Sequence, residues 1–368
     1  MEYIALKNIC KINMGQSPDS SSYNDNKDGI PFFQGNADFG EKYPVTRVWC
    51  NAPIKVAQPN DILISVRAPI GALNFAKEEC CIGRGLAALT PDRSKVSLEF
   101  IYWVLKWKKA ELNSKGTGST FKAISRKVLE ETLVPAIDFE KQYEYAEILG
   151  KTYSVIKKYK KELNCLDGLI KARFVELFDG KYPEDTLLNL CNIVDYRGKT
   201  PEKVEHGLPF ITAKNVKMHH MTLEPREYIS KETYDKVMVR GFPKEGDVVF
   251  TTEAPLGNVC RIPHFDTEFY IGQRIVTMQT DALNPTYLEY ALSDEEFVRK
   301  YMGKSSGSTV TGIRVRLLEQ LTIPVPARTL QDEFSTFVHQ VDKSKVAVQK
   351  ALDETQMLFD SLMQEYFG

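Results

Sequence analysis

The chain has 368 residues, of which 43% are hydrophobic and 26% are charged, with a formal net charge of −1. This length predicts two or three domains with cores of their own, and the composition excludes disordered and fibrous proteins. The near-zero charge means that any binding of nucleic acid must come from local basic patches, because the whole molecule attracts polyanions weakly.

The first seven residues, MEYIALK, begin in strand-like alternation and lack the basic start and apolar core of a signal peptide. The sequence contains no run of about 18 apolar residues, so no membrane span is expected. We expect a cytoplasmic protein. The seven cysteines show no Cys-x-x-Cys and no zinc-ligand spacing. This pattern predicts reduced, mostly buried thiols and no metal site.

The first part of the chain is β-rich, with short apolar runs separated by Gly, Pro, Asn and Asp. Pro31–Phe33 and Asp61–Val66 are typical of buried strands, and Ala68–Gly71 predicts a tight turn at a strand end. Ser97–Trp107 predicts a short helix, which is followed by a loop of Gly, Ser and Thr at Lys115–Thr120.

A last strand, ending at Val134-Pro135, leads into a predicted helix of about 40 residues, roughly 60 Å long. The same order of parts then occurs a second time. Matched residues are separated by 189 positions: Lys115, Gly118, Ser119, Thr120, Ile124, Leu129, Val134, Pro135 and Gln142 match Lys304, Gly307, Ser308, Thr309, Ile313, Leu318, Ile323, Pro324 and Gln331. A period this long, present twice, indicates a duplicated domain, because solenoid repeats run at roughly 20–50 residues.

The second copy repeats each predicted element. Pro209–Ile211 and Asp247–Thr252 match the two buried strands, and Ala254–Gly257 matches the tight turn. Pro285–Leu292 predicts the short helix, and Lys304–Thr309 is the second loop of Gly, Ser and Thr. A second long helix closes the copy.

The two long helices carry a coiled-coil heptad pattern over about four heptads, which Lys345 and Thr355 interrupt in the second helix. We expect the helices to pack on each other, antiparallel across a pseudo-two-fold axis; packing of each helix on its own domain is the alternative. The predicted packing residues are Leu149, Ile156, Leu163, Leu166, Ile170, Val341, Val348, Leu352, Phe359 and Leu362.

The predicted fold class is therefore α+β, with two β-rich domains that are each followed by a long helix. We expect the first β-rich domain at 1–138, a central long helix at 139–182, the second domain at 183–327 and a C-terminal long helix at 328–368. The two helices would form the antiparallel coiled coil.

Three short motifs resemble catalytic sites but are incomplete. Asn284–Tyr287 resembles the adenine-holding loop of amino-methyltransferases, yet the first copy lacks it, and Asn before Pro is an ordinary helix start. Gly198–Thr200 lacks the first glycine of a phosphate loop, and Asp92 with Lys95 lacks the second acidic residue of a nuclease site. His219-His220 reads as part of a loop rather than as ligands, so we predict no catalytic residue.

Along essentially its whole length, the chain resembles the specificity subunit (HsdS) of type I restriction–modification systems. The resemblance rests on Asp247–Gly257, on Ile271–Arg274, on the Gly-Ser-Thr loop leading through Ile313 and Leu318 to Ile323–Pro326 and Gln331, and on Glu365–Gly368. It implies two target-recognition domains, each reading one half of a split DNA site, held apart by two helices.

The resemblance also implies partners. Two methyltransferase subunits would dock on the chain, and restriction subunits would join them. S-adenosylmethionine, ATP and Mg would be bound by those partner subunits, and this chain would hold no cofactor.

Base edges are read by side chains with paired donors and acceptors, and phosphate contacts position them. The candidate DNA-binding residues are Arg67, Arg84, Lys115, Ser119, Thr120, Lys122, Arg197, Lys199, Gln273, Arg274, Lys304, Ser308, Thr309 and Arg314. Ser65–Pro69 differs from Thr251–Pro255, which we expect if the two domains read different half-sites. The alternatives are that these charges are only solvated, that the loops only connect, or that the chain is a non-catalytic tandem β-domain scaffold that binds protein.

Overall fold

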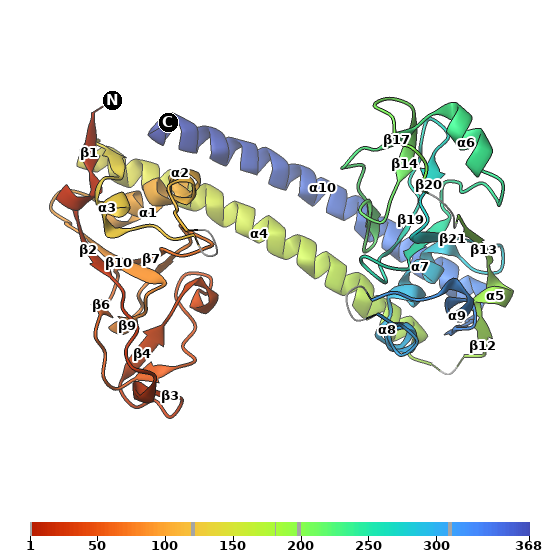
Figure 1. Ribbon diagram of the computed structural model, residues 1–368, viewed down its shortest axis with the longest axis horizontal. Helices are drawn as coiled ribbons and strands as arrows, with labels where there is room; N and C mark the ends of the chain where they lie inside the picture. The colour runs from red at the N-terminus through yellow and green to blue at the C-terminus, as the bar shows by residue number, and fades with distance from the viewer. Residues whose placement is uncertain (1, 119–121, 181, 197–199, 308–310) are drawn as a thin grey trace. The chain divides into compact units, whose positions relative to one another are not determined.

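The computed structural model describes residues 2–118, 122–180, 182–196, 200–307 and 311–368 (Figure 1). The chain divides into two compact units, unit 1 (Met1–Lys160 with Lys350–Gly368) and unit 2 (Lys161–Gln349). Each unit therefore contains one β-rich domain together with part of both long helices, and each is described by itself.

The described strands of unit 1 form an antiparallel four-stranded sheet, a mixed five-stranded sheet and a strand pair. The four-stranded order is β2 (Cys10–Met14), β10 (Leu86–Pro91), β7 (Ile62–Ser65) and β8 (Leu73–Phe75). The five-stranded order is β3 (Tyr23–Asn24), β5 (Trp49–Cys50), β4 (Ile30–Phe33), β9 (Cys80–Ile82) and β6 (Val56–Ala57), with β4 and β9 parallel. The pair is β1 (Tyr3–Ala5) with β11 (Leu133–Pro135), and the helices are η1 (Leu6–Asn8), η2 (Ser20–Ser22), η3 (Asn36–Asp38), α1 (Leu98–Trp107), α2 (Lys109–Ser114) and α3 (Arg126–Glu130).

Unit 2 repeats this plan. Its four-stranded order is β13 (Asn192–Asp195), β21 (Ile275–Gln279), β18 (Val248–Thr251) and β19 (Val259–Arg261). The other sheets are β17 (Tyr228–Ile229), β14 (Leu208–Ile211) and β20 (Tyr270–Ile271); β15 (Val216–Lys217) with β16 (His220–Met221); and β12 (Glu184–Thr186) with β22 (Thr322–Pro324). The helices are α5 (Leu187–Leu190), α6 (Lys231–Val237), α7 (Pro285–Ser293), α8 (Glu295–Met302) and α9 (Val315–Leu318).

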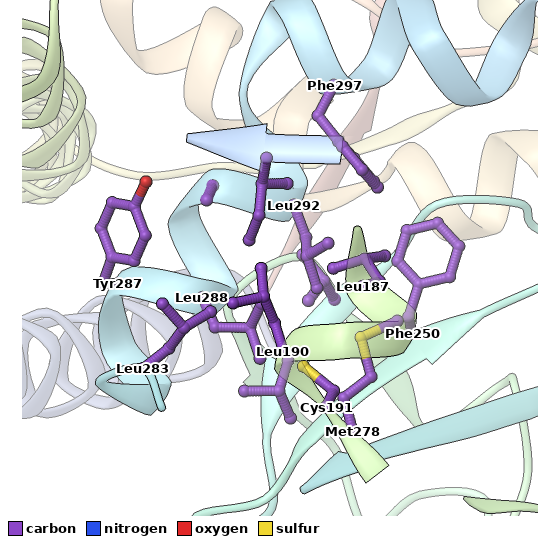
Figure 2. Close-up of a cluster of buried hydrophobic side chains, with 14 of the residues drawn as sticks. Leu187, Leu190, Cys191, Phe250, Met278, Leu283, Tyr287, Leu288, Leu292 and Phe297 are labelled. Carbon is purple, nitrogen blue, oxygen red and sulfur yellow. The ribbon is translucent and has the colours of Figure 1, made fainter. Parts of the chain in front are cut away.

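The central strand β18 shows why its sequence is a continuous apolar run. Val248 and Phe250 belong to the large cluster under α7, where Figure 2 places Phe250 near Leu187 and Met278. Val249 points to the other face and joins a second buried cluster. A strand covered on both faces has no solvent side, so it does not alternate between apolar and polar residues.

The long helices α4 (Phe139–Phe178) and α10 (Arg328–Phe367) each have 40 residues, as the sequence predicted. In unit 1 the start of α4 meets the end of α10, where the rings of Tyr145 and Tyr366 stack at 3.8 Å. In unit 2 the end of α4 meets the start of α10, where the rings of Phe178 and Phe334 lie 5.5 Å apart. The two helices therefore pack in antiparallel directions.

The ten predicted packing residues are at least partly buried in the structure. Leu149, Ile156, Ile170, Val341, Leu352 and Phe359 are buried, and Leu163, Leu166, Val348 and Leu362 are half-buried. Lys345, which interrupts the heptad pattern, places its ammonium 2.6 Å from the Asp167 carboxylate of α4. A polar residue within the helix pair is thus matched by a charged partner on the facing helix.

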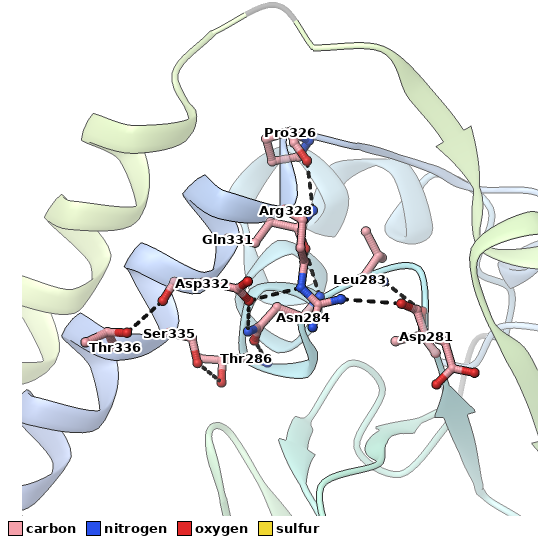
Figure 3. A network of polar contacts seen from close by, with 11 residues as sticks. Asp281, Leu283, Asn284, Thr286, Pro326, Arg328, Gln331, Asp332, Ser335 and Thr336 are labelled. Atoms are coloured by element: carbon pink, nitrogen blue, oxygen red, sulfur yellow. Dashed lines mark hydrogen bonds and ion pairs between the residues drawn. The ribbon is translucent and has the colours of Figure 1, made fainter.

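One buried glutamine in each copy joins a long helix to a short one, and Figure 3 shows the glutamine of the second copy. Gln331 accepts a hydrogen bond from the Asn284 backbone N–H at 2.8 Å and donates one to the Pro326 carbonyl at 2.8 Å. Gln142, 189 positions earlier, does the same with Ser97 N–H and the Ile137 carbonyl. The repeat match at these glutamines is therefore explained by helix docking.

Candidate nucleic-acid interface

Corresponding backbone hydrogen bonds define the same edge in both units. Gly83 N–H donates to the Phe33 carbonyl at 2.8 Å, and Gly272 N–H donates to the Ile211 carbonyl at 2.8 Å. Val66 N–H donates to the Gly85 carbonyl, and Thr252 N–H donates to the Arg274 carbonyl, both at 2.9 Å. Each residue that follows these donors therefore has a structural counterpart: Arg84 corresponds to Gln273, and Arg67 corresponds to Glu253.

Glycine allows a close approach where this edge passes the end of the neighbouring strand. A Cβ added to Gly83 would lie 3.2 Å from the Phe32 ring, and a Cβ added to Gly272 would lie 3.0 Å from the Phe210 ring. The close approach fixes the next residue, Arg84 or Gln273, at the exposed rim of the sheet.

The first hollow lies at this edge in unit 1 and has a volume of about 260 Å³. Its lining is Gln34, Gly35, Asn36, Arg67, Ala68, Arg84 and Gly85. Both arginines are exposed, and within the described residues neither guanidinium forms an ion pair. The sequence-predicted pair Arg67 and Arg84 is thus brought together in one polar hollow.

The second hollow lies at the corresponding edge of unit 2 and has a volume of about 220 Å³. Its lining is Thr200, Lys203, Phe210, Thr212, Ala213, Lys214, Glu227, Ala254, Gly272, Gln273 and Arg274. Arg274 Nε lies 2.8 Å from Glu253 Oε1, and Lys203 Nζ lies 2.8 Å from Glu227 Oε2. Gln273 and Arg274 lie together as predicted, but the arginine has an acidic partner.

The Gly-Ser-Thr loops adjoin the two hollows at their described ends. Thr117 and Ala123 exchange two backbone hydrogen bonds, and Ala123 also bridges to Arg67. In unit 2, Gly312 bridges in the same way to Ser306 and to Glu253. Each loop therefore starts and ends beside the residue that borders its hollow.

The remaining candidate residues fall into three groups: one is ion-paired, some are exposed near the loop ends, and some lie outside the described residues. Lys115 Nζ lies 2.6 Å from Glu111, and hydrogen bonds from Lys108 and then Lys115 lower the pKa of that carboxyl. Exposed side chains near the loop ends are Lys122, Lys304 and Arg314. Ser119, Thr120, Arg197, Lys199, Ser308 and Thr309 lie outside the described residues.

Sequence reasoning missed several residues that line the hollows. Gln34 and Asn36 follow β4, and Lys214 follows β14. The sequence match between Pro31–Phe33 and Pro209–Ile211 was the available signal, because the residues directly after both segments line equivalent hollows.

Two of the three motifs that resemble catalytic sites have structural roles, and Gly198 and Lys199 of the third lie outside the described residues. Asn284 caps α7 by accepting from the Thr286 N–H at 2.9 Å, with proline at the next position. Hydrogen bonds from Ser94 and Lys95 lower the pKa of Asp92 to about 2, so that this carboxylate closes a turn. Among the described residues, no group of His, Cys, Asp and Glu could hold a metal ion, and no helix is long and apolar enough to cross a membrane.

The two domains are held on the long helices by different chemistry. In unit 1 the rings of Phe75 and Tyr102 stack at 5.0 Å, and Lys106 Nζ lies 3.5 Å from the Tyr153 ring centroid. Burial lowers the pKa of that lysine. The β8–α1–α4 contact of unit 1 is therefore aromatic, with one cation over a ring.

In unit 2 the corresponding positions carry charges. Arg261 Nε lies 2.6 Å from Glu289 Oε2, and His219 Nδ1 lies 3.0 Å from Glu289 Oε1. A second arginine nitrogen lies 3.9 Å from Asp342 of α10, and the His219 ring stacks on Tyr290 at 4.2 Å. His219 lies in a turn, as predicted, whereas His220 begins β16. The His219 ring takes part in a partly buried polar network that the sequence did not indicate.

The fold and the two hollows define a duplicated protein that presents two related but different polar surfaces on a pair of long helices. The family described as "Type I restriction modification DNA specificity domain" matches residues 1–165 and, a second time, residues 186–355. The chain belongs to this family, which confirms the resemblance found in the sequence.

Curated relatives and a solved structure agree with this assignment. The chain is 42% identical over 171 residues to the putative type I restriction enzyme MjaX specificity subunit of Methanocaldococcus jannaschii, covering 46% of this chain but only 40% of that relative. It is 20% identical to the type I restriction enzyme EcoBI specificity subunit of Escherichia coli, covering 99% and 85% of the two chains. The S subunit structure from M. genitalium superposes with a TM-score of 0.61 at 15% identity, covering 100% and 96%, which supports the fold.

Proposed function

We propose that the chain is the DNA sequence-recognition subunit of a type I restriction–modification complex. The observation that carries this proposal is the pair of hollows, which occupy the same edge in both copies. Arginine, glutamine, asparagine and lysine side chains line them, and these residue types read base edges in the major groove.

The contrast between loops and hollows supports a division of labour. The Gly-Ser-Thr loops have the same residue at four of their six positions in the two copies, whereas the hollows beside them have different linings. Phosphate contacts carry no sequence information, so they need not differ between two domains, but base contacts must differ if the half-sites differ. We therefore assign phosphate contacts to the loops, with Lys122 and Arg314 beside them, and base contacts to the hollows.

This division favours a bipartite, asymmetric DNA site. Residues 1–138 and 183–327 would each read one half, and the helices at 139–182 and 328–368 would set the gap between the halves. The duplicated frame offers two equivalent surfaces to a partner, which suits two methyltransferase subunits, with restriction subunits joining through them. We expect the partner subunits to bind S-adenosylmethionine, ATP and Mg. We expect the complex to act in the cytoplasm.

The test is methylation mapping of DNA from cells that express this chain with the methyltransferase subunit of its own system. The expected result is a two-part motif with different halves and a fixed gap. Binding of that DNA by the purified complex should fall about 10³–10⁵-fold between 50 and 200 mM salt if six to ten phosphates are contacted. A protein-binding scaffold would show neither the motif nor the salt dependence, and that outcome would refute the proposal.

A further inference from the structure

The two hollows differ at the positions that are most exposed to a ligand. Arg67 and Arg84 line the first hollow; their counterparts in unit 2 are Glu253, which precedes the lining residue Ala254, and Gln273, which lines the second hollow. Because the backbone hydrogen bonds around these residues are the same in both units, the difference is one of side-chain chemistry on an equivalent edge.

In the first hollow both cations are available to a ligand. Arg67 and Arg84 are exposed, no acidic side chain lines the hollow, and within the described ranges neither arginine has an ion-pair partner. An arginine fork without a partner can donate two parallel hydrogen bonds to the O6 and N7 acceptors of guanine.

In the second hollow the basic side chains already have acidic partners. Arg274 is held by Glu253 at 2.8 Å, and Lys203 is held by Glu227 at 2.8 Å. A guanidinium bonded to a carboxylate has fewer donors left for a base, and the carboxylate repels the phosphates and the acceptor atoms of guanine.

The side-chain amide of Gln273 is an uncharged group of this hollow that could contact a base edge. Its Nε2 donates to the Thr200 hydroxyl oxygen at 3.1 Å. This bond orients the amide, and among the described residues its second N–H and its carbonyl oxygen have no hydrogen-bond partner. A glutamine amide with one donor and one acceptor matches the N7 and N6–H₂ edge of adenine.

We propose that the first hollow reads a G·C pair through Arg67 or Arg84 and that the second hollow reads an A·T pair through Gln273. This inference rests on the proposed function, and it names the chemistry of each half-site. The geometry also predicts that the two hollows act independently, because each is lined by residues of its own unit only.

The experiment compares methylated motifs of the complex that contains wild-type chain, Arg67→Ala, Arg84→Gln or Gln273→Ala. At least one arginine variant should relax a G·C position in one half of the motif by about 10- to 100-fold, and Gln273→Ala should relax an A·T position in the other half by a similar factor. Arg93→Gln, an exposed arginine beyond the opposite end of β10, and Gln320→Ala, an exposed glutamine outside the second hollow, are matched controls that should leave the motif unchanged.

The outcomes separate this inference from the proposed function. Relaxation of A·T by the arginine variants, relaxation of G·C by Gln273→Ala, or an unchanged motif in all three variants would overturn the base assignment while leaving two-part recognition intact. A wild-type complex that methylates no two-part motif, or arginine and glutamine variants that alter the same half, would overturn the proposed function itself.

Discussion

The charge network of unit 2 offers a sharp test of how that domain is fastened to α10. Glu289 has only 2% of its side chain exposed, yet it is bonded to Arg261 and His219. Glu289→Gln keeps the shape of the side chain and removes its charge, so that the arginine loses its closest carboxylate. Breaking a fully buried ion pair costs about 3–5 kcal/mol.

The expected cost is lower here because 37% of the Arg261 side chain is exposed and water can solvate the orphaned charge. We expect a loss of about 2 kcal/mol, near the strength of a hydrogen bond to a charged group. Such a loss corresponds to a roughly 30-fold decrease in protection of the backbone amides. The decrease should be found in α7 and β19, whose contact the network stabilises.

Native-state amide hydrogen exchange followed by mass spectrometry measures this protection segment by segment. Tyr102→Phe changes the counterpart of Glu289 in unit 1, where the hydroxyl has no hydrogen bond among the described residues, and should leave exchange unaltered. Glu232→Gln removes an exposed ion pair of α6 and should also have no measurable effect. Unchanged exchange of α7 in Glu289→Gln, or an equal change in α1 of unit 1, would refute the reasoning.

Other perturbations test the edge, the frame and the thiols. Gly85→Ala should destabilise unit 1 by about 1–3 kcal/mol, because the added Cβ would lie 2.4 Å from a backbone carbonyl oxygen. Gly35→Ala in the same hollow, with nothing within 4 Å, should not, as thermal unfolding can show. One heptad inserted after Lys160 and another after Gln349 should lengthen the pair of long helices by about 10 Å. The gap of the methylated motif should then widen by about three base pairs. An unchanged gap would contradict the proposal that the long helices set the gap. A thiol reagent should modify only Cys165 in the native chain, because the other six cysteines are buried and burial raises the pKa of four of them to about 12; rapid reaction of a second thiol would contradict this.

The periodic parts of the fold could be predicted from sequence. Helices α4 and α10, the short helices α1 and α7, and the strands β7 and β18 all lie where the apolar patterns indicated. The backbone imposes these periods, so each element leaves its own signal in consecutive residues. The buried, free cysteines were predicted for a similar reason, since their spacing fits no metal or disulfide framework.

The hollows could not be assembled from sequence in the same way. Gln34 and Arg84 are 50 positions apart in the chain, and only the parallel pairing of β4 with β9 brings them to one edge. The sequences of the two copies show that Glu253 differs from its counterpart Arg67, but the ion pair of Glu253 with Arg274 depends on the tertiary structure. Loop residues that read a ligand follow no backbone period, so nothing in the local sequence marks them.

The division of the chain into units explains why the frame is repeated while the hollows differ. The chain passes from unit 1 to unit 2 between Lys160 and Lys161, and back to unit 1 between Gln349 and Lys350. These two boundaries are also separated by 189 positions. Each short helix packs on the long helix of its own copy and also on that of the other copy. The ring of Phe100 in α1 lies 5.7 Å from Phe367 of α10, and the ring of Tyr287 in α7 lies 4.8 Å from Phe178 of α4.

Each long helix therefore contributes residues to both units, whereas each hollow is lined by residues of one unit. The residues that dock helices, such as Gln142 and Gln331, make the same hydrogen bonds in both copies. Within the described residues, Arg84 and Gln273 form hydrogen bonds with the side chains of Ser17 and Thr200, which lie outside both long helices, so the two positions could diverge without disturbing the frame. Packing constraints of this kind permit two different reading surfaces on one duplicated scaffold.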